Sequence, residues 1–138
     1  MHLSLVEAFG RFGCKPTDRL RALSAMAADG ALVLNCSPAH FGHPAQGVLR
    51  YEDRLSREAV GAKRTELLGQ HLTLALEAAL PVRMIVTSVV SETKRGARCH
   101  VRSDLIGKVV QFDGDHFIVD FTRPSELHQA TPAVRASR

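Results

Sequence analysis

Apolar positions spaced three and four residues apart predict one long helix near the middle of the chain. Residues 62–80 place a wide apolar face on one side, made by Leu67, Leu68, Leu72, Ala75, Leu76, Ala79 and Leu80. Pro81 ends the helix, because the residue before a proline is pushed out of the helical region. A short helix is also predicted near the N-terminus, where Ser4 and Glu7 have the spacing of a capping box.

Runs rich in β-branched residues predict the strands of a sheet. Residues 82–90 have the composition of a buried strand, and shorter runs at 48–51 and 97–102 are further candidates. Residues 18–36 fit either a helix or a hairpin. We favour a hairpin with strands near 19–26 and 31–36, because Asp29-Gly30 is a turn dipeptide. Residues 37–47 contain two prolines and two glycines and predict a loop.

The last hairpin can be predicted in detail from the alternation of apolar residues. A two-residue loop at Gly114-Asp115 pairs Phe112 with Phe117 and Val110 with Val119, and it turns the apolar side chains of both strands toward the core. Glycine at the first loop position suits a type II′ turn.

These elements together predict an α+β fold in one domain over residues 1–124. We expect a mixed or antiparallel sheet of about four to six strands, with the 62–80 helix packed on it and the short N-terminal helix beside that helix. The connection from 48–51 through the long helix to 82–90 is predicted to be a parallel crossover. Residues 125–138 lack any periodicity, and we expect them to form a disordered tail.

Composition is ordinary for a globular protein, with 45% apolar and 23% charged residues. No apolar run reaches the roughly 20 residues that span a bilayer, and the first residues have no signal-peptide pattern. The three cysteines are an odd number spread far apart, which favours reduced thiols over disulfides. We therefore expect a cytoplasmic location.

Charge points to a polyanionic partner. The formal net charge is +4, and the segment 94–102 concentrates basic residues. Guanidinium groups make bidentate bonds to phosphates, so we predict nucleic-acid contacts by Lys94, Arg95, Arg98 and Arg102. Residues 50–64 form a second basic cluster with interleaved acidic residues, typical of a solvated, salt-bridged face. We include its members Arg50 and Arg54 in the predicted contact set.

A zinc site is the candidate cofactor site. Cys36, His40 and His43 are close enough for one loop to present them, and thiolate and imidazole are preferred zinc ligands. The spacing matches no established zinc-finger pattern. The alternative is a buried cysteine at a strand end followed by two exposed loop histidines, with no cofactor.

Two catalytic patterns are weaker. Glu92-x-Lys94 has the form by which metal-dependent nucleases hold Mg²⁺, but an upstream aspartate on a neighbouring strand is not evident. Cys99 and His100 are adjacent, yet neighbouring residues on a strand point to opposite faces, which argues against a catalytic pair.

The sequence therefore favours a non-catalytic, small basic accessory module that binds nucleic acid or another polyanion through the 94–102 segment. A metal-dependent enzyme, with either the Glu92/Lys94 or the Cys36/His40/His43 set, is one alternative. A protein–protein interaction module is the other.

Overall fold

The computed structural model describes residues 3–58, 61–89 and 97–124. Its helices are α1 (Leu5–Gly10) and α2 (Lys63–Ala78), with 3₁₀ turns η1 (Pro38–His40) and η2 (Leu55–Arg57). The strands are β1 (Ser24–Met26), β2 (Leu32–Cys36), β3 (Phe41–Ala45), β4 (Val48–Arg54), β5 (Val82–Val89), β6 (Ala97–Phe112) and β7 (His116–Thr122). No helix within these described residues is long and apolar enough to cross a membrane.

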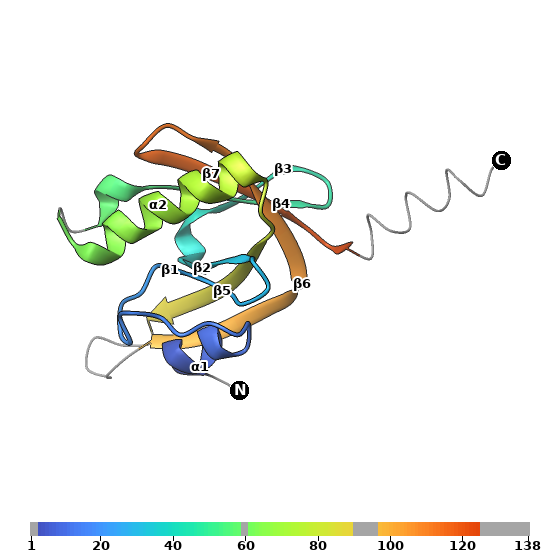
Figure 1. Cartoon of the computed structure of the whole chain (residues 1–138). Coiled ribbons are helices and arrows are strands. Elements are labelled where there is room, and N and C mark those ends of the chain that lie inside the picture. Colours follow the sequence, from blue (N-terminus) through green and yellow to red (C-terminus); the bar gives the residue numbers. More distant parts are fainter. Residues whose placement is uncertain (1–2, 59–60, 90–96, 125–138) are drawn as a thin grey trace.

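The strands form one seven-stranded sheet in the order β1-β2-β5-β6-β7-β4-β3 (Figure 1). All neighbours are antiparallel except β2 and β5. The α+β class with one long and one short helix is therefore confirmed, with more strands than expected. The additional strand is β3, in the segment predicted to be a loop. A strand at the sheet edge pairs on one side only and therefore tolerates Pro44.

The predicted parallel crossover between 48–51 and 82–90 is wrong. β4 pairs with β7 in antiparallel register, and the parallel neighbour of β5 is β2. The register explains this choice, because it places Leu49, Tyr51 and Asp53 of β4 opposite Phe121, Val119 and Phe117 of β7 on the core side of the sheet. Cross-strand pairs of this kind stabilise β4 beside β7.

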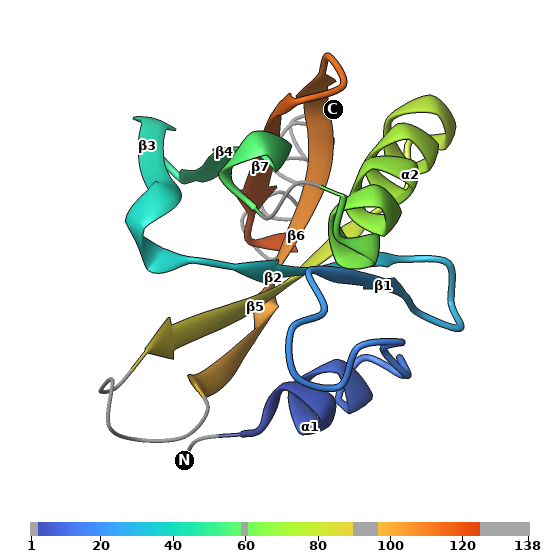
Figure 2. The ribbon, with the colours of Figure 1, turned by 90° about the vertical axis from the view of Figure 1, so that its left-hand side faces the viewer.

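A single bent strand, β6, joins the two parts of the sheet (Figure 2). Its first part pairs with β5 up to Arg102, whereas Val82 of β5 already pairs with Gly107, so residues 103–106 form the bend. A Cβ atom on Gly107 would lie 2.6 Å from the Phe121 ring. Only glycine allows this close approach. The strand that was predicted to end at residue 102 therefore continues past the bend to Phe112.

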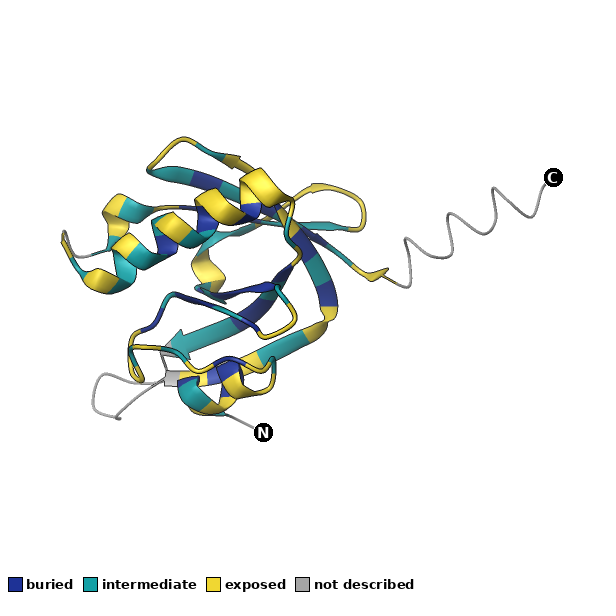
Figure 3. Cartoon of the chain, in the orientation of Figure 1, coloured by how far each residue is buried: buried dark blue, intermediate teal, exposed yellow. Residues whose placement is uncertain are grey.

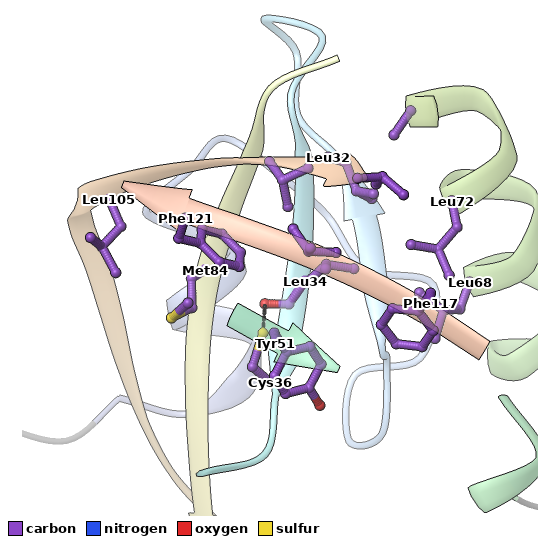
Figure 4. Packing of buried hydrophobic residues seen from close by; sticks show 14 residues of the cluster. Leu32, Leu34, Cys36, Tyr51, Leu68, Leu72, Met84, Leu105, Phe117 and Phe121 are labelled. Carbon is purple, nitrogen blue, oxygen red and sulfur yellow. Dashed lines mark hydrogen bonds between the residues drawn. The ribbon is translucent and has the colours of Figure 1, made fainter. Parts of the chain in front are cut away.

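The concave face of the sheet carries the main core. Leu68 and Leu72 of α2 pack against this face together with apolar residues of β2, β4, β6 and β7 (Figure 4). On the opposite face, α1 covers Val33, Ile85 and Cys99, so the prediction that this helix lies beside α2 is wrong. Burial is concentrated where the helices lie over the sheet (Figure 3). The capping box of α1 is confirmed: the Ser4 hydroxyl accepts from the Glu7 backbone N–H at 3.1 Å, and the Glu7 carboxylate accepts from the Ser4 N–H at 2.9 Å.

Both predicted hairpins form. β1 and β2 pair across a turn in which Gly30 has φ +92°, so the hairpin interpretation of residues 18–36 is confirmed, with a shorter first strand. In the last hairpin Phe112 pairs with Phe117, and Gly114 has φ +104°. The predicted pairing of Val110 is wrong. A bulge shifts the register, so Val109 pairs with Val119 while Val110 is 38% exposed.

Candidate functional site

The first part of β6 presents three basic side chains on one face. Arg98, His100 and Arg102 lie opposite Ser88, Val86 and Met84 of β5, on the concave side of the sheet. Arg98 and His100 are exposed and Arg102 is half-buried. We call these three residues the β6 cationic face.

The reverse side of the same stretch is buried. Cys99 is fully buried beneath α1, and Val101 packs against the same apolar cluster. Cys99 and His100 therefore point to opposite faces, as predicted, and no catalytic pair forms between them. Successive side chains of a strand point to opposite faces. Because Cys99 and Val101 pack under α1, Arg98, His100 and Arg102 must point to the other face.

The bend in β6 brings a carboxylate to the end of this face. Arg102 donates to both oxygens of Asp104 at 2.9 Å, and the Arg123 Nε lies 3.7 Å from the same carboxylate. The hydrogen bonds from Arg102 hold the pKa of Asp104 below its usual value. Two arginines around one carboxylate leave an excess of one positive charge. Arg102 has five N–H donors, and those that face away from Asp104 can reach another anion.

A groove of about 590 Å³ begins beside Arg102. At its base lie the buried side chains of Met84, Leu105 and Phe121, which Figure 4 shows at the end of the core away from α2. Its other lining residues are Pro38, Phe41, His43, Gly47, Val48, Leu49, Val86, Arg102 and Arg123. We call it the open-end groove. Its base is apolar, and its basic groups belong to His43, Arg102 and Arg123.

The other predicted contact residues do not join this site. Arg50 lies on the convex side of β4, where its guanidinium donates to both oxygens of Asp120 at 2.8 and 2.9 Å. Arg54, on the same side, pairs with Asp115 at 3.4 Å. Their charges are thus shared with carboxylates on β7 and its turn. Lys94 and Arg95 lie outside the described residues.

The predicted zinc ligands are not brought together. Cys36 is fully buried in the main core, and this burial, with a smaller effect from Asp53, raises the pKa of its thiol far above the ordinary value. A protonated thiol is a poor ligand and a poor nucleophile. His40 points to Asp53, with Nδ1 3.8 Å from the carboxylate, whereas His43 lines the groove. Across residues 3–58, 61–89 and 97–124 no three His, Cys, Asp or Glu side chains gather to hold a metal. Glu92 and Lys94 lie outside these residues.

A separate polar network is centred on the buried side chains of Tyr51 and Asp53. The Tyr51 hydroxyl accepts from the Ser37 N–H at 3.0 Å and donates to Asp53 at 3.2 Å, and Arg57 donates to Asp53 at 2.6–2.9 Å. Burial alone would raise the pKa of Asp53. The hydrogen bonds from Arg57 and the Arg54 N–H outweigh it and hold that pKa below its usual value. These contacts tie η1 to η2 and have a structural role.

Sequence reasoning missed Arg123, Phe41 and Val48 as members of the site. Arg123 stands at the predicted end of the domain, about twenty positions after Arg102, and nothing local marks it. The bend in β6 and the pairing of β7 with β6 bring it back to Asp104. No local pattern in the sequence could have found this contact.

The chain was compared with known protein families, with curated proteins and with solved structures, and nothing in the three comparisons matches it.

Proposed function

We propose that this chain is a non-catalytic module that binds nucleic acid or another polyanion through the β6 cationic face. The observation that carries the proposal is the succession of Arg98, His100 and Arg102 on one side of a strand whose other side is buried. Alternate residues on a strand are roughly 7 Å apart, so one stretch of phosphate backbone can contact all three.

The chemistry of the face suits phosphates. Arginine makes bidentate, charge-assisted bonds to phosphate oxygens, and the imidazole of His100 adds a further hydrogen-bond donor. Both arginines stand on a strand that packs against β5 and α1, so their backbone positions are fixed before binding. Asp104 pairs with Arg102 and lowers the local charge, and we therefore expect moderate affinity that depends on salt.

A salt titration tests the proposal. Binding of a fluorescent single-stranded oligonucleotide should weaken steeply with added salt, because each neutralised phosphate releases counterions. The double variant Arg98→Ala/Arg102→Ala should reduce the slope of log K against log salt concentration by about 1.4, which is roughly 0.7 for each lost phosphate contact.

The matched control is Arg19→Ala. Arg19 is exposed and lines a separate hollow with Lys63 and Arg64, away from β6. It should leave the slope unchanged. Absence of binding at low salt would contradict the proposal, as would a slope that responds to Arg19→Ala and not to the β6 variant.

A further inference from the structure

The main core lies beneath a helix at one end and beneath a groove at the other. Leu68, Leu72 and Ala75 of α2 close the first end (Figure 4). At the other end Met84 and Phe121 have no exposed surface, yet the open-end groove lies directly above them. Within the described part of the chain, no helix covers this end. The groove is therefore a hollow over the buried core that residues 3–58, 61–89 and 97–124 leave unfilled.

The groove has the size of a small-molecule site. Its volume of about 590 Å³ falls within the range of roughly 300–1,000 Å³ that is typical of ligand pockets. Phe41 lines it, and the Phe41 ring packs on Tyr51 with 5.2 Å between centroids. Tyr51 is in turn held by Ser37 and Asp53. This wall is anchored to the core and keeps the groove open.

Charge selects the kind of occupant. Arg102, Arg123 and His43 line the groove together with apolar groups, and Asp104 offsets one of these charges. Such a site suits an apolar body with an attached anion. Arg102 belongs both to the groove and to the β6 cationic face, so a chain of phosphates on that face leads to the groove. A nucleobase with its phosphate has both required parts.

We propose that the open-end groove receives an unstacked base of a single-stranded nucleic acid whose phosphates lie on the β6 cationic face. This inference rests on the function proposed above and adds the class of ligand. Bases in a duplex are stacked and paired, so they cannot enter, and the module should discriminate against duplexes.

The test compares three probes of one sequence and length by fluorescence anisotropy: a single strand, its duplex, and a single strand with abasic residues. The single strand should bind about tenfold more tightly than the other two, since one stacked base contributes roughly 1–3 kcal/mol. Val48→Trp fills the groove and should reduce single-strand binding to the abasic level. Val110→Trp is the matched control, because Val110 is 38% exposed at the β6 bulge and does not line the groove.

Folding of each variant is checked by thermal unfolding. If Val48→Trp does not fold, Pro38→Trp fills the groove from the exposed start of η1 and should have the same effect. Equal binding of all three probes, unchanged by either groove variant, would overturn the inference and leave the proposed function standing. No binding of any probe at low salt would end both. A dimer seen by sedimentation that Val48→Trp dissolves would assign the groove to a second copy of the chain and also overturn the inference.

Discussion

The two halves of β6 show how one strand can serve both stability and binding. In the second half, Val109 and Phe112 face the concave side and pack in the main core. In the first half, the same side of the strand carries Arg98, His100 and Arg102. On the opposite side of β6, the first half is buried, with Cys99 under α1, and the second half is exposed, as at Lys108.

The difference follows from what covers each half. α2 lies over the second half, where Gly69 faces Phe112: a Cβ on Gly69 would lie 4.0 Å from the Phe112 ring, which is an ordinary packing distance. Residues 63–78 form this cover, and they do not extend over the first half. A strand face is apolar where a helix removes it from water and charged where it stays accessible, because unpaired buried charge is costly. The bend between the halves lets one strand meet both conditions.

Weakening the packing of α2 on the main core should cause the largest loss of stability. Leu72→Ala removes a fully buried side chain of α2, and we expect it to lower the free energy of unfolding by about 2–5 kcal/mol. Leu74→Ala on the same helix is the control. Leu74 is 48% exposed, so the change should stay within about 0.5 kcal/mol. Urea denaturation measures both, and equal effects would mean that α2 does not cover the core as described.

A side chain at Gly107, next to the bend, should cause the next largest loss of stability. Gly107→Ala places a Cβ 2.6 Å from the Phe121 ring, a fully buried side chain, and should cost about 2–3 kcal/mol. Gly42→Ala on edge strand β3 meets nothing within 4 Å and should be nearly neutral. Thermal unfolding of the two variants separates close packing from a general cost of replacing glycine. A stable Gly107→Ala variant would refute the role of the bend.

A smaller loss of stability, which depends on pH, should distinguish the buried carboxylate of Asp53 from the exposed carboxylate of Asp104. The lowered pKa of Asp53 stabilises the fold above the ordinary carboxyl value of about 4, and this stabilisation is lost as pH falls through the lower folded value. Asp53→Asn should therefore cost about 1–2 kcal/mol at neutral pH and less near pH 3. Urea denaturation at the two pH values measures this change.

Asp104→Asn provides the comparison on the open side. Its side chain is 47% exposed, and solvent screens its pairs with Arg102 and Arg123, so the cost should be at most about 1 kcal/mol. If Asp53→Asn were no more destabilising than Asp104→Asn at neutral pH, the buried network would not support the core as argued.

Much of the local structure could be predicted because it depends on near neighbours. The capping box of Ser4 and Glu7, the turns at Gly30 and Gly114, and the length of α2 each depend on residues within a few positions of one another. The opposite facing of Cys99 and His100 also follows from the alternation of a strand alone.

The failures concern the pairing of strands, some of it within a hairpin and some between segments far apart in the chain. The bulge at Val110 depends on the register with Val119, and the strand β3 exists because Tyr51 of β4 pairs with Phe41. The sequence indicated that Arg98 and Arg102 share a basic segment. It could not show that Arg50 faces the other side of the sheet and pairs with Asp120.

The sequence by itself determined the class of fold, the helices, the hairpin turns and the cationic stretch of β6, because hydrophobic periodicity and turn chemistry act over short distances. Only the tertiary structure decided the order of the strands, the bend at residues 103–106, the close packing of Gly107 and the open-end groove. These depend on which surfaces remain uncovered after α2 and α1 have packed, and that outcome is set by contacts among residues far apart in the chain.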